Sequence, residues 1–188
     1  MRSRYLEDKE LAGLEEAAGS EWLPLAVALC TGLRVGDVLK IRPEDLTPEG
    51  VRYVAEKTGK EGFAQLPPAL LRQLRENAGE GWCFPSPRAA GKHLTRQAAW
   101  QRIKRAAERA GIDPAGVSPH ALRKCFAVER LRAEGLGAVQ RALQHDRPGT
   151  TELYALSDWL TGANADKPLL RRDIPMLATK IAELLARG

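Results

Sequence analysis

The sequence predicts a mostly α-helical (α+β) fold that includes one small antiparallel β-sheet. Apolar residues recur at helical spacing in most segments, from Tyr5–Ala18 near the start to Ile174–Ala186 near the end. Gly50–Pro67 differs, because apolar and polar residues alternate there on both sides of a glycine-containing turn. Apolar residues make up 44% of the 188 residues, which is enough to form the core of one domain.

Helices in the N-terminal part are predicted from periodic apolar residues and from a glycine stop signal. They are an amphipathic helix over Tyr5–Ala18, a buried helix over Glu21–Cys30 that ends at Thr31-Gly32, and a short turn or helix over Arg42–Leu46. Arg34 and Asp37 lie three positions apart on a new helical turn. A partly buried arginine needs an acceptor, so we expect Asp37 to hold Arg34. This contact is either a structural ion pair or a support that turns the remaining N–H groups of Arg34 toward a ligand.

The alternating segment is expected to form a β-hairpin. Its first strand covers Val51–Ala55 and includes Tyr53, which we interpret as an ordinary core or surface aromatic. Its tip is the glycine-bearing stretch Glu56–Gly62. Lys57 stands at the strand end, where its amine can point into a cleft, whereas Lys60 on the tip is expected to be a solvated charge.

The C-terminal part is again predicted to be helical, and its most basic helix raises two alternatives. The predicted helices cover Pro68 to about Gly79, Leu94–Ala110, Pro119–Glu134, Ala138–Leu143, Thr150–Ala155 and Ile174–Ala186, with loops over Gly79–Gly91 and Asp158–Asp173. Thr95 is the expected N-cap of the basic helix, which places Arg96 and Gln97 at its start. Such a helix suits a DNA major groove. A solvated charged face is an equally good interpretation.

The composition narrows the function classes. A net charge of +5 favours a polyanionic partner. The three scattered histidines and three unpaired cysteines argue against a zinc site and predict reduced, buried thiols in a cytoplasmic protein. Pro24 interrupts the longest apolar run, so no membrane span is expected, and the charged start Met1–Tyr5 has no apolar region behind it to make a signal peptide.

The segment from Ser118 to Lys124 carries a potential phosphate site. Ser118 is a suitable N-cap and Pro119 suits the first helical position. His120 and Arg123 then lie on one face of the new helix. A guanidinium and an imidazole near a helix N-terminus favour an anion, although this motif by itself is weak.

Five motifs follow one another in the chain, namely Thr31-Gly32-Leu33-Arg34 with Asp37, Lys57 in the hairpin, His120-Ala121-Leu122-Arg123, Leu143-Gln144-His145, and Tyr154 nine residues later. In this order they resemble the motifs of the catalytic domain of the tyrosine recombinases, the phage integrase family. Gln144 stands where the family usually has glycine. The chain also has little room for the N-terminal DNA-clamping domain that family members usually carry.

The resemblance implies a fold like that of DNA breaking-rejoining enzymes and a 3′-phosphotyrosyl intermediate, with no metal or nucleotide cofactor. The implied catalytic residues are Arg34, Lys57, His120, Arg123, His145 and Tyr154, with Asp37 in support. Tyr154 would attack phosphorus, and the two arginines would clamp the non-bridging oxygens. Lys57 would protonate the leaving 5′-oxygen, and the two histidines would hydrogen-bond the phosphate, with His120 a candidate acceptor for the tyrosine proton.

Further expectations concern partners and domains. The partner is double-stranded DNA, on which the protein would associate with itself as a tetramer, near the nucleoid and not at a membrane. The residues expected to contact DNA are Lys60, Lys92, Arg96, Gln97, Arg102 and Lys124. The catalytic domain is expected over residues 1–157, followed by a tail over 158–188 whose last helix docks either on a neighbouring protomer or on its own core. Alternatives are a type IB topoisomerase-like enzyme and a recombinase-derived DNA-binding module that no longer cuts.

Overall fold

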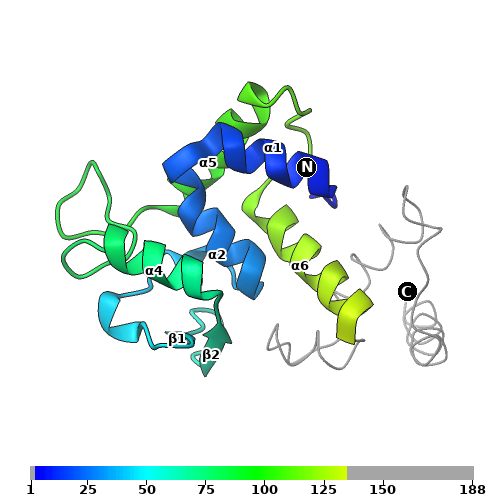
Figure 1. The fold of residues 1–188 in the computed structure, drawn as a ribbon. Coiled ribbons are helices and arrows are strands. Elements are labelled where there is room, and N and C mark those ends of the chain that lie inside the picture. Colours follow the sequence, from blue (N-terminus) through cyan, green and yellow to red (C-terminus); the bar gives the residue numbers. More distant parts are fainter. Residues whose placement is uncertain (1–2, 135–188) are drawn as a thin grey trace. The chain divides into compact units, whose positions relative to one another are not determined.

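The computed structural model describes residues 3–134 (Figure 1). The helices are α1 (Asp8–Ala18), α2 (Leu23–Thr31), α3 (Val35–Val38), α4 (Pro68–Asn77), α5 (Arg96–Arg109) and α6 (Pro119–Glu134). The strands are β1 (Gly50–Val54) and β2 (Glu61–Gln65), and short 3₁₀ turns cover Gly19–Trp22 and Pro43–Asp45. The predicted fold class, helical with one small antiparallel sheet, is therefore confirmed.

The chain divides into two compact units, Met1–Arg123 and Lys124–Gly188. The site described below lies in the first unit. The predicted domain boundary after residue 157 lies outside the described residues. So do the predicted helices at Ala138–Leu143, Thr150–Ala155 and Ile174–Ala186, and the loop at Asp158–Asp173.

The first two helices end at glycines with a positive φ, which is 54° at Gly19 after α1 and 68° at Gly32 after α2. α1 begins at Asp8, later than predicted, because the preceding residues are extended and Arg4 N donates to Gly116 O at 3.2 Å. α2 ends at Gly32, which takes a left-handed conformation with φ of 68° and donates its N–H to Ala28 O at 2.9 Å. This turn frees the Gly32 carbonyl for a partner from outside the helix.

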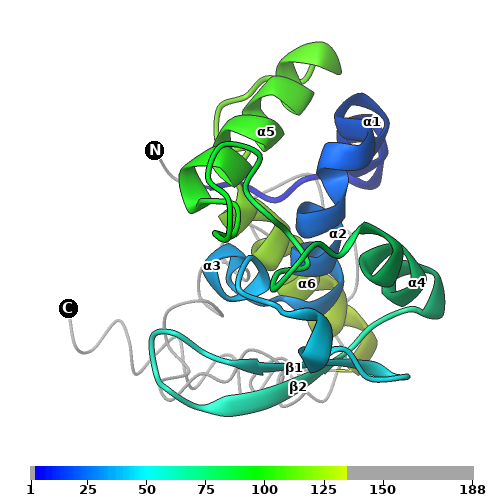
Figure 2. The ribbon, with the colours of Figure 1, turned by 90° about the vertical axis from the view of Figure 1, so that its left-hand side faces the viewer.

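The sheet is the predicted hairpin. β1 and β2 pair antiparallel with Gly50 opposite Gln65 and Val54 opposite Glu61. The alternation puts Val51 and Tyr53 inside the protein, while Arg52 and Val54 face outward. The hairpin lies near α3 (Figure 2).

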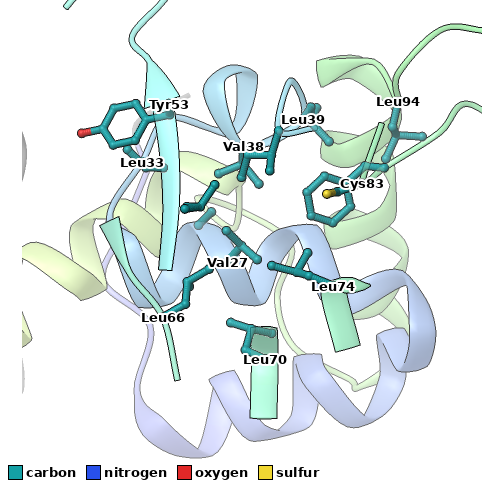
Figure 3. Close-up of a cluster of buried hydrophobic side chains, with 14 of the residues drawn as sticks. Val27, Leu33, Val38, Leu39, Tyr53, Leu66, Leu70, Leu74, Cys83 and Leu94 are labelled. Atoms are coloured by element: carbon teal, nitrogen blue, oxygen red, sulfur yellow. The ribbon is translucent and has the colours of Figure 1, made fainter. Parts of the chain in front are cut away.

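The core is built around α2. Val27 on this helix is fully buried among side chains from α3, β1, α4 and the loop before α5 (Figure 3). α1 and α5 lie side by side in both ribbon views, with Leu14 and Ile103 buried. The expectation of buried thiols holds for Cys83 and Cys125 but is wrong for Cys30, which is exposed.

No helix within residues 3–134 combines the length and the apolar character needed to cross a membrane.

Candidate active site

A pocket of about 510 Å³ brings together side chains from four separate segments of the chain. Its polar lining comes from the α3 turn, the hairpin tip, the start of α5 and the start of α6. These residues are Arg34, Asp37, Glu56, Lys57, Arg96, His120 and Arg123. Four of the six predicted catalytic residues therefore line one hollow.

Arg34 stands at the turn between α2 and α3. Its backbone is extended, and its carbonyl accepts from Asp37 N at 2.8 Å and from Val38 N at 3.0 Å, which starts α3. The residue is half-buried. The helix start thus fixes the backbone of Arg34 while its side chain lines the pocket.

Arg123 approaches the same turn from α6. Its side chain is 4% exposed, and Nη1 donates to the Gly32 carbonyl that the end of α2 leaves available. Burial, followed by repulsion from Arg34, lowers the pKa of Arg123 to about 10, so the guanidinium stays charged at neutral pH. Two guanidinium groups at one pocket repel each other, and an anion bound between them relieves that repulsion.

Asp37 has a different partner from the one that the sequence suggested. Its buried carboxylate accepts from Glu56 N at 3.0 Å through Oδ1. Within the described part of the chain, no hydrogen bond or ion pair joins Arg34 to Asp37. Asp37 therefore connects the α3 turn to the base of the hairpin tip.

Lys57 follows Glu56 in the chain and lies in a tight turn. Ala55 O accepts from Thr58 N at 3.1 Å and from Gly59 N at 2.7 Å, so the chain reverses just beyond Lys57. Lys57 is exposed and lines the pocket. No ion pair with another described residue engages its ammonium group.

His120 is placed by the N-cap of α6. Ser118 Oγ accepts from Ala121 N at 3.3 Å, as the sequence predicted for an N-cap. The preceding loop is held by Arg4 N and by Lys104 Nζ, which donates to Pro114 O. His120 is exposed at the first turn of α6, where helix N–H groups favour an anion.

Arg96 is the first residue of α5, and the predicted N-cap Thr95 accepts from Ala98 N at 3.1 Å. The Arg96 side chain crosses α3 at Gly36, where an added Cβ would lie 2.7 Å from Nη2 and closer still to Nε. Its guanidinium then pairs with Glu56. Arg96 was predicted to contact DNA, and the structure places it at the pocket.

The other residues predicted to contact DNA fall into different environments. Lys60, Lys92 and Gln97 are exposed. Arg102 Nε instead pairs with Glu21 at 3.3 Å, in a cluster where Arg105 and Arg109 also approach Glu21. Lys124 is only 2% exposed, so its position does not offer a surface contact. The predicted His145 and Tyr154 lie outside the described residues.

Glu56 and Gly36 are pocket residues that the sequence did not single out. Tyr53, which was interpreted as an ordinary core or surface aromatic, lies within electrostatic range of Arg123. Burial raises the pKa of the Tyr53 phenol, and Arg123 acts on it in the opposite direction. Its ring belongs to the core and its hydroxyl points out of the cluster (Figure 3). Only the position of Glu56 beside Lys57 was a signal in the sequence. Among the described residues, no three His, Cys, Asp or Glu side chains gather as a metal site requires.

Comparisons with known proteins show the family of the chain. The model of the Phage integrase family matches residues 8–159, and the chain belongs to this family. Tyrosine recombinase XerD of Rhizobium meliloti (strain 1021) is 37% identical over 136 residues, which are 66% of this chain and 43% of that protein. Tyrosine recombinase XerD of Vibrio cholerae serotype O1 is 34% identical over 143 residues, which are 69% of this chain and 47% of that protein. The chain thus spans about half the length of these curated relatives.

Solved structures share the fold. A XerH site-specific recombinase bound to its palindromic difH substrate matches with a TM-score of 0.70 and 20% identity, covering 84% of this chain and 51% of that one. A lambda integrase tetramer bound to a Holliday junction matches with a TM-score of 0.67 and 19% identity, covering 89% and 50%. The helical architecture with its small sheet is therefore the architecture of recombinase catalytic domains.

Proposed function

We propose that this chain is the catalytic part of a site-specific DNA recombinase that cleaves and rejoins DNA through a 3′-phosphotyrosyl intermediate. One observation carries the proposal, namely that Arg34, Lys57, His120 and Arg123 line a single pocket. Membership of the phage integrase family supports it, and the matched region 8–159 includes the positions of His145 and Tyr154.

The proposed reaction is a phosphoryl transfer in which each group has one task. The Tyr154 oxygen attacks phosphorus and its proton passes to His120, while the bond from phosphorus to the 5′-oxygen breaks. Lys57 gives a proton to that oxygen, so the products are a 3′-phosphotyrosyl bond and a free 5′-hydroxyl. Arg34 and Arg123 stabilise the charge on the non-bridging oxygens, and His145 donates a hydrogen bond to one of them. Attack by a 5′-hydroxyl from another strand reverses these steps and rejoins the DNA.

The proposed partners are double-stranded DNA and further copies of the same protein. Besides Arg96, the pocket carries four cationic or imidazole groups suited to one backbone phosphate. The proposed contacts to the flanking duplex are Arg96 and the exposed Lys60, Lys92 and Gln97. A lambda integrase forms a tetramer on a Holliday junction, and we propose the same assembly state here. The proposed location is the cytoplasm, on the nucleoid, because the proposed substrate is DNA.

The test uses a pool of nicked duplexes with a randomised core, incubated with the full chain. Cleavage near the nick releases a short fragment, which traps the covalent adduct. A protein–DNA adduct that is absent with Tyr154→Phe supports the proposal, and its absence with the unaltered chain overturns it. Sequencing the trapped DNA then yields the site, and strand exchange between two such sites distinguishes a recombinase from an enzyme that only relaxes supercoils.

A further inference from the structure

Glu56 is, with Asp37, one of two acidic side chains in a pocket whose other charged groups suit a phosphate. A carboxylate there would repel the ligand unless its charge were already matched. Its Oε2 accepts from Arg96, and its Oε1 lies 3.4 Å from Lys40 Nζ. The hydrogen bond from Arg96 lowers the pKa of Glu56, so the carboxylate is ionised at neutral pH.

The contacts of Glu56 tie one residue to three places in the fold. Its backbone N–H donates to the buried Asp37 on α3, its side chain reaches Lys40 just beyond α3, and it meets Arg96 at the first turn of α5. Glu56 directly precedes Lys57. The residue before the predicted acid is therefore held through both its backbone and its side chain.

The approach of Arg96 depends on Gly36. The guanidinium passes so close to Gly36 that any side chain there would meet it. The arginine thus reaches Glu56 over the α3 turn that also carries Arg34. The ion pair joins the hairpin tip to the start of α5, and the Arg96 side chain passes Gly36 of α3 on the way.

Stability does not account for this arrangement. The Arg96 and Glu56 side chains are 62% and 41% exposed, and exposed ion pairs contribute little to folding. Lys57 to Lys60 at the hairpin tip are all exposed, and backbone hydrogen bonds from Thr58 N and Gly59 N to Ala55 O close the turn itself. A contact of small energetic value still restricts where the tip can move.

We propose that Glu56 is a positioning residue for Lys57: by joining Asp37, Lys40 and Arg96 it holds the base of the hairpin tip so that the Lys57 ammonium stays in the pocket. This inference rests on the proposed function, in which Lys57 protonates the leaving 5′-oxygen. It assigns Glu56 no contact with DNA and no proton of its own.

The test distinguishes an effect of Glu56 on protonation of the leaving 5′-oxygen from any other effect of Glu56 on cleavage. Single-turnover cleavage at saturating DNA is measured on the site obtained above and on the same duplex with sulfur in place of the bridging 5′-oxygen. A thiolate leaves without protonation, so this substrate does not need the acid. We expect Glu56→Ala to be roughly tenfold slower on the oxygen substrate, since small displacements of a catalytic group cost one to two orders of magnitude. On the sulfur substrate we expect it to match the unaltered protein.

Three variants serve as controls. Lys57→Ala should be slower still on the oxygen substrate and should also recover on the sulfur substrate. Arg34→Ala should be slow on both, because a phosphate clamp is needed whatever the leaving group is. Glu44→Ala breaks the exposed pair with Arg42, which has an N–O distance of 3.3 Å and lies outside the pocket, and should leave both rates unchanged.

The outcomes are distinct. An unchanged rate for Glu56→Ala on the oxygen substrate, or an equal loss on both substrates, overturns the positioning role. If Glu56→Ala fails to fold by circular dichroism, Glu56→Gln replaces it, because glutamine keeps the size of the side chain while losing its charge. If the unaltered chain forms no adduct on either substrate, the proposed function fails and this inference fails with it.

Discussion

Replacing Arg123 by methionine should separate activity from stability. The guanidinium is almost fully buried, and its burial lowers its pKa from the ordinary value of 12.5 to about 10. This difference corresponds to a cost on the order of 3 kcal/mol for keeping the group charged in the folded protein at neutral pH. Methionine is similar in length and carries no charge, so the substitution removes that cost.

The substitution also removes the hydrogen bond to Gly32, and this loss lowers the free energy of unfolding. Arg123 Nη1 donates to the carbonyl at the end of α2, and leaving a buried carbonyl without a partner costs roughly 1–3 kcal/mol. The two terms nearly cancel, so we expect Arg123→Met to change the free energy of unfolding by less than about 2 kcal/mol. Cleavage should fall by roughly 10² to 10³, which is typical when one charge-stabilising donor is lost.

Urea unfolding followed by circular dichroism measures the first quantity, and adduct formation on the nicked duplex measures the second. Arg105→Met is the matched control, because Arg105 is an exposed arginine paired with Glu21 away from the pocket, and neither quantity should change much. A loss of more than about 4 kcal/mol for Arg123→Met would make the guanidinium chiefly structural. Cleavage within threefold of the unaltered rate would refute its role as a phosphate clamp.

Three further predictions concern the surroundings of the site. Gly36→Ala should displace Arg96 from Glu56 and slow cleavage of the oxygen substrate, and the rate should recover on the sulfur substrate. Urea unfolding should show no loss of stability, because alanine favours a helix by about 1 kcal/mol over glycine. Asp37→Ala should lower the free energy of unfolding by about 1–3 kcal/mol more than Asp37→Asn, since only asparagine keeps an oxygen for Glu56 N; equal losses would contradict this. Burial raises the pKa of the Cys83 thiol from 9 to about 12, so the unfolded chain loses this proton first as the pH rises. The contribution of this thiol to the free energy of unfolding is fully present below pH 9 and falls by up to about 4 kcal/mol toward pH 12. When the free energy of unfolding is measured against pH, Cys83→Ala should therefore show a smaller decrease at alkaline pH.

The helices, the hairpin and the order of the motifs were readable from the sequence because they depend on short-range physics. Thr95 and Ser118 cap their helices as predicted, and Gly32 ends α2, since capping involves residues two to four positions apart. The alternation around Tyr53 produced β1 for the same reason. These local signals also placed Arg34, Lys57 and His120 at the ends of elements, where side chains can meet.

Only the tertiary structure decided which charges meet. Asp37 binds the N–H of Glu56 and not Arg34, Arg102 is engaged by Glu21, and Lys124 is buried despite standing in a basic stretch. Residues 40 and 84 positions apart are brought into contact by the packing of α5 against α3 and α1, which no local pattern encodes. The residue types and their spacing were therefore enough to indicate a phosphate site, because each chemical role requires a particular side chain. They were not enough to predict the partner of each charge, because an ion pair depends on distance in space, and that distance is set by the packed core.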